Sequence, residues 1–332
     1  MVAAARTPLH NEVVWGHKQD QRLNAPNITP FVSVVIPTHN RANFIRDAVT
    51  SALNQGAAVG EVIVVDDGST DDTSAVLLRV ADPRLRVLRQ PQSGPAIARH
   101  NGWRAARGQW ILFLDSDDAL ETGAAEALLA TAQQHPGRIP FGLASVHAQT
   151  VDSPPAYTFC FAHRSGSLLK ELSFYSAGTI LSCLFPRATL SAVGGFNEMP
   201  ESPYREDFEF ALRLALRCEF AHLPRVCYRI RMHAGNRHRP QQRKAWEFSI
   251  ACLDRCLGLH PRHLLLRQRA KAYFRGLMAD EDLERGEARA ALGGYLQSLA
   301  WWPVKLGAWK GLLRTAARLL KPGPALPPTL RT

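Results

Sequence analysis

The sequence predicts a mixed α/β fold in which a mostly parallel, Rossmann-like sheet is flanked by helices. Apolar runs at residues 31–36, 61–65 and 110–114 do not alternate with polar residues, which is typical of strands buried on both faces. Helical patterns of about 10 to 14 residues separate the runs. Repeated strand–helix–strand order implies right-handed crossovers and therefore a parallel sheet.

The first expected strand, at 31–36, leads into a helix expected over 43–55, and a second strand follows at 61–65. This second strand ends in Asp66 and Asp67, at the edge where such sheets bind ligands. A carboxylate at this edge can accept a hydrogen bond from a ribose hydroxyl or from N3–H of uracil. A ligand-binding role is therefore favoured for Asp66 and Asp67. The following pair, Asp71 and Asp72, is interpreted as helix capping.

A third strand is expected at 84–88, and the next helix opens after Gly94 and runs to about residue 107. The helix N-terminus together with Arg99 suits a diphosphate, because the helix dipole and the guanidinium both favour anions. On the residues alone, an exposed arginine on a helix surface is an equally good interpretation.

The fourth strand, at 110–114, runs directly into Asp115, Asp117 and Asp118. Three like charges this close repel one another, and a divalent cation is the usual way to make the arrangement favourable. Hard oxygen ligands indicate Mg²⁺ or Mn²⁺ rather than zinc. The alternative is a solvated acidic turn that caps a helix starting near Ala119.

Four segments of the first 120 residues resemble the nucleotide-binding half of family-2 glycosyltransferases, inverting enzymes of the GT-A fold. They are VSVVIPTHNR, EVIVVDDGSTDDT, ARHNGWRAARG and WILFLDSDD, in the family's order. The resemblance implies that Asp115, Ser116 and Asp117 form the DXD element at the donor, with Asp117 as the more direct metal ligand. It also implies that Asp66 or Asp67 contacts the uracil or ribose. The rest of the nucleotide pocket is implied to be Pro37, Thr38, Asn40 and Arg41.

The following half is expected to carry the acceptor site. A strand is expected at 179–185, and residues 194–198 resemble the family's GGFDE loop, with Asn197 where Asp is common. The resemblance therefore places Gly195 and Phe196 near the acceptor or the diphosphate. Between about 135 and 178 no pattern can be read.

Glu206 and Asp207 open a helix expected over 208–217. Capping is a serious alternative, because the helix dipole stabilises carboxylates at a helix N-terminus. The family pattern has a Glu-Asp pair here, which implies that Asp207 is the catalytic base and that Glu206 positions the acceptor or neighbouring groups.

Residues 226–236 resemble the family's Arg-X-His-X-X-Ser/Asn segment. The resemblance implies that His233 joins the metal or diphosphate shell and that Arg231 lies near the acceptor or diphosphate. A lone histidine is more often structural, so a purely structural His233 stays open.

From about residue 241 the pattern is helical, which completes the expected organisation. A loose arm spans 1–30, a glycosyltransferase domain 31–240 with its halves divided at 120, a helical extension 241–322 and a disordered tail 323–332. A basic amphipathic helix is expected over 305–321, beside two tryptophans. It suits a membrane interface, and packing on the catalytic domain with a solvated basic face suits it equally well.

Positive charge is concentrated near the C-terminus. From residue 225 onward there are 21 Lys and Arg against 7 Asp and Glu, whereas the first 224 residues hold 19 against 22. This imbalance indicates an anionic partner surface, either membrane lipid or nucleic acid.

The sequence contains no apolar run of signal-peptide or membrane-spanning length. We therefore expect a cytoplasmic protein that is at most peripheral on the inner face of the cytoplasmic membrane. The six cysteines show no zinc spacing and are expected to be reduced thiols.

Together these features predict an inverting, metal-dependent glycosyltransferase of the hexosyl- or N-acetylhexosaminyl-transferase class. The expected donor is a nucleotide-sugar, with UDP as the expected nucleotide, and the expected acceptor is a glycan or a lipid-linked molecule. This reaction would place the enzyme in cell-surface glycan or polysaccharide synthesis. One alternative is a pyrophosphorylase-like nucleotidyltransferase, disfavoured because no glycine-rich loop bearing Arg or Lys follows the first strand. The other is a non-enzymatic protein that binds nucleic acid or membrane. Nucleic acid is not expected, because the basic residues are interleaved with helical apolar positions.

Overall fold

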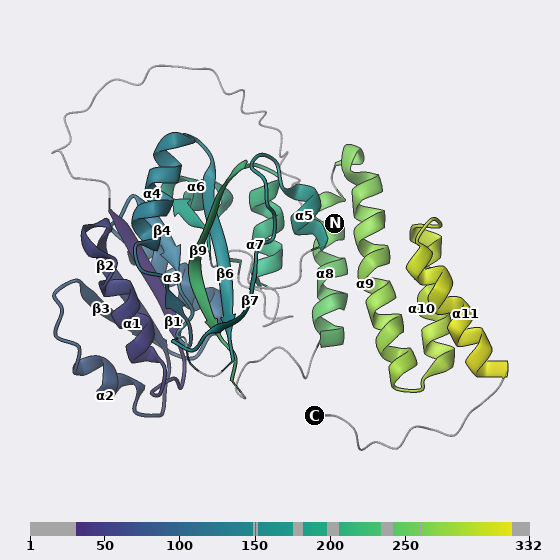
Figure 1. Ribbon diagram of the computed structural model, residues 1–332, viewed down its shortest axis with the longest axis horizontal. Coiled ribbons are helices and arrows are strands. Elements are labelled where there is room, and N and C mark those ends of the chain that lie inside the picture. Colours follow the sequence, from purple (N-terminus) through teal and green to yellow (C-terminus); the bar gives the residue numbers. More distant parts are fainter. Residues whose placement is uncertain are drawn as a thin grey trace, which may run out of the picture.

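The computed structural model describes residues 31–148, 150, 152–174, 182–197, 206–233, 242–258 and 260–320. The arm expected at 1–30 and the tail expected at 323–332 lie outside the described residues. Two sheets with their covering helices form one part of the molecule, and a row of helices extends from it (Figure 1).

The main sheet has the strand order β3-β2-β1-β4-β8. The first four strands in the chain are parallel, and β8 runs antiparallel to β4. The predicted parallel sheet is therefore confirmed. Its order changes direction between β1 and β4, which makes the carboxyl ends of these two strands a ligand-binding switch point. The strands are β1 (Val32–Thr38), β2 (Val59–Asp67), β3 (Leu85–Gln90), β4 (Trp110–Phe113) and β8 (Leu184–Pro186).

The second sheet has the strand order β5-β9-β6-β7. The helix expected near Ala119 begins instead at Ala124, because Ala119 and Leu120 pair with β9. Two of these strands lie in the stretch without a readable pattern, and the longer of them is buried along nearly its whole length. The strands are β5 (Ala119–Leu120), β6 (Ile139–His147), β7 (Pro155–Phe159) and β9 (Phe220–Arg231).

Three helices connect the parallel strands of the main sheet, and four more lie along the chain between β5 and β9 in the described residues (Figure 1). They are α1 (Ile45–Leu53), α2 (Thr73–Leu78), α3 (Pro95–Ala105), α4 (Ala124–Gln134), α5 (Leu169–Phe174), α6 (Arg187–Val193) and α7 (Glu206–Ala215). The short 3₁₀ turns Gly56–Ala58 and Pro261–His263 precede β2 and α9.

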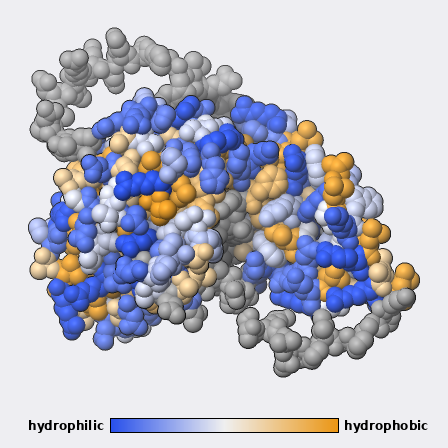
Figure 2. All heavy atoms as spheres, in the orientation of Figure 1, coloured by the Kyte–Doolittle hydropathy of each residue, from blue (hydrophilic) through white to orange (hydrophobic). Residues whose placement is uncertain are grey.

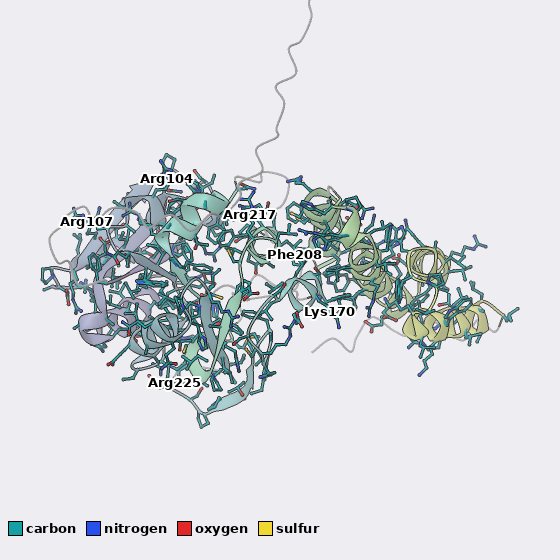
Figure 3. All side chains as sticks on the ribbon, turned by 90° about the horizontal axis from the view of Figure 1, so that it is seen from above. Arg104, Arg107, Lys170, Phe208, Arg217 and Arg225 are labelled. Carbon is teal, nitrogen blue, oxygen red and sulfur yellow. The ribbon has the colours of Figure 1, made fainter. Side chains whose placement is uncertain are left out.

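The predicted helical extension is confirmed as four helices, each packed on the one before it. Figure 3 shows Phe208 where α7 meets this row, and its ring lies 5.6 Å from that of Phe274 between centroids. Trp246, Phe248 and Phe274 belong to the same hydrophobic core as the sheets. The helices are α8 (Gln242–Leu257), α9 (Leu264–Glu284), α10 (Ala288–Trp301) and α11 (Leu306–Leu320).

A second, smaller core joins the end of α9 to α10 and α11. The last helix packs on α10 through small residues: a Cβ at Gly311 would lie 2.3 Å from the ring of Tyr295. Leu312 packs against the second core, whereas Leu306 and Leu313 point outward and are 74% and 69% exposed. Figure 2 shows hydrophobic residues at the surface over α10 and α11. Among the described helices, none combines the length and the apolar character needed to cross a bilayer.

Candidate functional site

Residues from distant parts of the chain meet at the carboxyl edge of the main sheet. Thr38 ends β1, Asp67 ends β2, the acidic stretch follows β4, and Arg231 ends β9. The side chain of Arg99, from the second turn of α3, contacts Glu206 at the start of α7. The structure thus brings the predicted site residues to the switch point of the sheet.

Asp115, Asp117 and Asp118 form a compact acidic cluster. Each offers a carboxylate oxygen, and these oxygens lie within 4.8 Å of one another. Burial raises the pKa of Asp118 well above its usual value, and the charges of Asp117 and Asp115 raise it further. A cation would relieve this repulsion, and three hard oxygens fit Mg²⁺ or Mn²⁺.

Arg99 links this cluster to α7. Its Nη2 donates to Asp115 Oδ1 at 2.7 Å, and its Nη1 donates to Glu206 Oε1 at 2.8 Å. Burial lowers the pKa of Arg99, but the two carboxylates outweigh burial, so the guanidinium is firmly charged. Arg99 is therefore not the exposed surface arginine of the alternative interpretation.

The Glu206–Asp207 pair divides its contacts. Burial raises the pKa of Glu206, Arg99 opposes this effect, and the charge of Asp207 adds to it. Asp207 Oδ1 accepts a hydrogen bond from the N–H of Phe208 at 2.7 Å. Glu206 is thus held in an ion pair, while Asp207 stands at the helix N-terminus.

The carboxylate of Asp117 is flanked by two basic groups. His233 Nε2 lies 3.0 Å from Asp117 Oδ2, and Arg41 Nε lies 3.5 Å from the same oxygen. The ring of His233 packs on Phe44, with centroids 4.5 Å apart. The expected neighbourhood of Arg41, Asp117 and His233 is therefore present.

Arg231 contacts both α1 and the acidic turn. Its backbone N–H donates to Asp118 Oδ1 at 2.9 Å, which holds the acidic turn against β9. Its guanidinium donates to Asp47 at 2.6 Å and lies 4.9 Å from the ring centroid of Phe44. In this arrangement Arg231 supports the wall of the site.

Asn40 fastens two loops to each other. It adopts a left-handed backbone conformation with φ of 53°, which asparagine tolerates better than most residues. Its Oδ1 accepts hydrogen bonds from the N–H groups of Thr70 and Asp71, at 2.8 and 3.3 Å. Pro37 is buried within β1, and the buried hydroxyl of Thr38 has no hydrogen-bond partner among the described residues.

Asp66 and Asp67 are both buried and hold loops in place. Asp66 accepts from the N–H of Ser69 at 2.8 Å. Asp67 accepts from the N–H groups of Ser93 and Gly94 at 2.7 and 2.8 Å, and so fixes the entry to α3.

The capping interpretation holds for one of the next two carboxylates. Asp71 accepts from the N–H of Thr73 at 3.0 Å. Asp72 stands at the N-cap of α2 but makes no capping hydrogen bond through its side chain, so the interpretation is wrong for Asp72.

Gly195 and Phe196 form the packed support beneath Arg99. Gly195 has φ of 66°, and a Cβ there would lie 2.5 Å from the indole nitrogen of Trp103, so only glycine fits. Phe196 is buried against Phe210, and its ring centroid lies 5.6 Å from the Arg99 guanidinium. The carbonyl of Gly195 accepts from the guanidinium of Arg213 at 2.6 Å.

Tyr228 is a contributor that sequence reasoning missed. Its hydroxyl accepts from the N–H of Asp115 at 2.8 Å and also hydrogen-bonds Asp118. Burial raises the pKa of this hydroxyl well above its usual value, so it stays protonated. No local sequence signal marks Tyr228, because its position follows from the long-range pairing of β5 with β9, in which it lies opposite Leu120.

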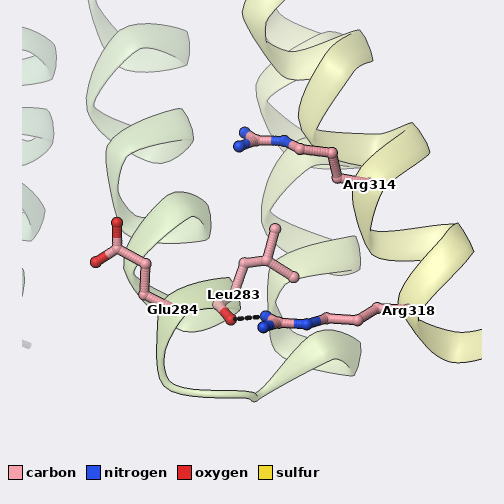
Figure 4. A pocket seen from close by; sticks show the side chains of 4 residues that line it. All are labelled: Leu283, Glu284, Arg314 and Arg318. Atoms are coloured by element: carbon pink, nitrogen blue, oxygen red, sulfur yellow. Dashed lines mark hydrogen bonds between the residues drawn. The ribbon is translucent and has the colours of Figure 1, made fainter. Parts of the chain in front are cut away.

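A separate open pocket lies in the helical extension, between α9 and α11. It is lined by Leu283, Glu284, Arg314 and Arg318, and Arg318 donates to the carbonyl of Leu283 (Figure 4). None of the predicted site residues lines this pocket.

Comparison with known proteins places the chain in a family. Residues 33–175 match the sequence profile of glycosyl transferase family 2. TuaG of Bacillus subtilis (strain 168), named as a glycosyltransferase of teichuronic acid biosynthesis, is 32% identical over 191 residues, which are 57% of this chain and 73% of TuaG. The chain belongs to glycosyl transferase family 2.

Longer members of glycosyl transferase family 2 are also similar to this chain. The hyaluronan synthase of Pasteurella multocida is 33% identical over 216 residues, and the chondroitin synthase of Escherichia coli is 29% identical over 244 residues. These alignments cover 63% and 69% of this chain but only 21% and 33% of those relatives, so the chain spans a fifth to a third of their length.

The predicted GT-A architecture is confirmed by a solved structure of another protein. TarS of S. aureus, residues 1–349, superposes with a TM-score of 0.61, at 16% identity, over 88% of this chain and 92% of that chain. The similarity includes helices beyond the sheets.

Proposed function

We propose that this chain is an inverting, metal-dependent glycosyltransferase that moves a sugar from a UDP-sugar to an acceptor hydroxyl. The observation that carries the proposal is the acidic cluster of Asp115, Asp117 and Asp118 at the switch point of the sheet, joined through Arg99 to Glu206. Family membership supports the reaction class. The same TarS region was solved with UDP-GlcNAc and with UDP, which supports a uridine nucleotide as the donor.

Asp117 and Asp115 would hold the divalent cation, Mn²⁺ or Mg²⁺, with His233 beside Asp117 as a further ligand. When bound, the cation would stabilise the negative charge that develops on the leaving diphosphate. Arg41, 3.5 Å from Asp117, would add positive charge on the same side.

The nucleotide would lie across the ends of β1 and β2. The unpartnered hydroxyl of Thr38 is available to it, and Pro37 and Asn40 would shape the pocket wall. Asp66 or Asp67 would contact the uracil or ribose in addition to holding its loop. Ser116 would complete the donor side beside Asp115.

Asp207 would act as the general base and deprotonate the acceptor hydroxyl, which attacks the anomeric carbon in a single displacement. The ion pair with Arg99 holds Glu206 in place, so Glu206 is assigned to positioning and Asp207 to proton transfer. Arg99 would orient Asp115 and would share the charge of the diphosphate. We keep Gly195, Phe196 and Arg231 as candidates for the acceptor or diphosphate side, acting through the walls that they build.

Two relatives named as hyaluronan and chondroitin synthases, and TuaG, named for teichuronic acid biosynthesis, support a role in cell-surface glycan or polysaccharide synthesis. A nucleotide-sugar donor is consistent with a cytoplasmic catalytic site. The exposed apolar residues of α11, interleaved with Lys310, Arg314 and Arg318, support a peripheral contact with anionic membrane.

Calorimetric titration of UDP, with and without Mn²⁺, tests the donor site. We expect metal-dependent binding by the wild type, its loss in Asp117→Ala, and its retention in the control Asp152→Ala, whose side chain is 86% exposed. Binding would then be followed by a screen of UDP-sugars for UDP release. Undiminished binding in Asp117→Ala, or none by the folded wild type, contradicts the proposed UDP site.

A further inference from the structure

A second group of metal-ligating side chains lies outside the donor site. Cys160, His163 and His222 each offer one ligand atom, and these atoms lie within 4.8 Å of one another. Cys160 and His163 stand three positions apart on the segment that follows β7, and His222 lies near the start of β9. The rings of the two histidines are 5.7 Å apart between centroids.

One ring nitrogen of this cluster lacks a hydrogen-bond partner in the part of the chain that the structure describes. His222 Nε2 is buried and has no hydrogen-bond partner among the described residues. A buried polar atom without a hydrogen-bond partner destabilises the folded state. An imidazole nitrogen in this position is free to act as a metal ligand.

We propose that Cys160, His163 and His222 bind Zn²⁺, with water as the fourth ligand. One thiolate and two imidazoles form a ligand set typical of zinc, in contrast to the all-oxygen cluster of the donor site. Metal–ligand bonds of about 2.0–2.3 Å need the three atoms to draw slightly closer together, and His163 is exposed and free to turn. The Cys160 thiol, which donates to the carbonyl of Ala162, would release one proton to solvent as the Zn–S bond forms.

The geometry assigns this site to structure and not to the transfer reaction. His222 lies opposite Phe141 and Arg231 opposite His147, which is six residues further along β6 and corresponds to about 20 Å. The site would tie the segment after β7 to the start of β9. The two are already joined by Gly166, which exchanges backbone hydrogen bonds with Phe220, and by Phe161, whose ring lies edge-on to that of Phe220.

Cobalt substitution and metal analysis of the full chain test the site. After chelation and reloading, we expect about one equivalent of Zn²⁺ per chain, and with Co²⁺ a thiolate-to-cobalt charge-transfer band together with the strong visible bands of tetrahedral cobalt. Cys160→Ser is expected to lose the charge-transfer band. Cys218→Ser, which changes another half-buried cysteine outside the cluster, is expected to keep it.

His163→Gln serves as a second variant, because His163 is exposed and its replacement leaves the core intact. It should lose most of the bound zinc and should no longer show the fall in unfolding temperature that chelation causes in the wild type. Cobalt held only at the acidic cluster would give no thiolate band and would disappear in Asp117→Ala. A wild type without the thiolate band, or a His163→Gln variant that retains full zinc binding, overturns the proposal, and neither result bears on UDP binding.

Discussion

At the scale of single residues, the site depends on charges that are buried together. Arg99 is desolvated, and such an ion is tolerated only where partners compensate for the water that it has lost. Asp115 and Glu206 do so from two elements that are distant in the chain. Because each partner is in turn held by Arg99, the DXD turn and the start of α7 are fixed relative to each other before any ligand arrives.

Tyr228→Phe is expected to weaken the proposed metal site without unfolding the protein. The substitution removes one hydroxyl, which accepts from the N–H of Asp115 and bonds Asp118. Groups that orient metal-binding carboxylates typically contribute about 10- to 100-fold to metal affinity or activity. The Mn²⁺ dependence of UDP binding, measured by calorimetry, should shift to higher concentration by a factor in that range.

Tyr295→Phe is the matched control. Tyr295 is equally buried, and its hydroxyl donates to Asp280 in the helical extension, away from the donor site. It should leave the Mn²⁺ dependence unchanged. Equal effects of the two substitutions would show that Tyr228 contributes only general stability.

Glu206→Gln and Asp207→Asn are expected to fail in different ways. Asp207→Asn should lower turnover about 100-fold or more and leave UDP binding intact, because it removes the proposed general base. Glu206→Gln should weaken donor binding as well as turnover and should lower the unfolding temperature, since it leaves buried Arg99 with one carboxylate fewer. UDP release and UDP calorimetry on both variants give the comparison. If Glu206→Gln lost only turnover while Asp207→Asn stayed active, the base would be Glu206.

At the scale of elements, β9 organises the molecule more than any motif suggests. Its end holds the acidic turn through Arg231 and supplies Tyr228, while its start carries His222. The strand pairs with β5 and β6, which join it to the residues after the DXD element. The contribution of β9 to the site therefore depends on its pairing register with β5 and β6, which a local sequence pattern does not encode.

Lys305 gives the helical extension a pH dependence. Its ammonium group donates to the carbonyl of Ala272 at 2.7 Å, and burial lowers its pKa to about 8 from an unfolded value of 10.5. Below pH 8 the folded chain bears the full cost of the buried charge. The free energy of unfolding should increase as the pH rises from about 8 to 10.5, because the folded state releases this proton before the unfolded state does. The increase is at most about 3 kcal/mol before solvent screening is taken into account.

Urea unfolding of wild type and Lys305→Met at pH 7 and pH 10 isolates this effect from the other groups that titrate. The free energy of unfolding of the wild type should increase relative to that of the variant at the higher pH. A constant difference between the two proteins would show that Lys305 titrates as an ordinary exposed lysine.

The outward face of α11 is expected to bind anionic vesicles. Leu313→Glu should lower partitioning onto phosphatidylglycerol vesicles about tenfold or more, because it removes a leucine worth about 1.5–3 kcal/mol of burial and adds a repelled charge. Leu78→Glu makes the same exchange at a leucine that is 88% exposed on α2, and it should have no effect. Vesicle sedimentation at low and high salt measures both. A wild type that ignores vesicles but shifts RNA in a salt-dependent way would instead support the nucleic-acid alternative.

At the scale of the whole molecule, the parallel sheet and the acidic edge could be predicted because both have local signals. Buried parallel strands read as unbroken apolar runs, and their ends carry the charged residues. The side-chain arrangement could not be predicted, because it depends on long-range pairing: Arg99 between Asp115 and Glu206, Tyr228 beneath the DXD turn, and Arg231 turned toward Asp47. The second sheet was missed because Pro140, Gly142 and Ser145 interrupt the apolar run of β6.

The hydrophobic cores indicate a domain boundary at a different position from the one that the sequence composition indicates. The sequence suggests a boundary at 240, but α8 and most of α9 share the core of the sheets, and only the end of α9 with α10 and α11 forms a second core. We therefore propose a functional boundary near Gly286.

Two truncated chains test this boundary. A chain ending at residue 286 is expected to stay monodisperse and folded and to bind UDP within about twofold of the full chain, since it loses only the small second core. A chain ending at 241 leaves Phe208 and its neighbours without Phe274, and losing one such buried ring alone costs about 3–5 kcal/mol, which is a large part of the stability of a typical domain. That chain should aggregate or unfold.

Phe274→Ala and Tyr295→Ala in the full chain make the same comparison without truncation. Phe274→Ala should lower UDP binding through unfolding, and Tyr295→Ala should leave UDP binding unchanged. A stable, UDP-binding chain of 241 residues would return the boundary to the position that the composition suggests.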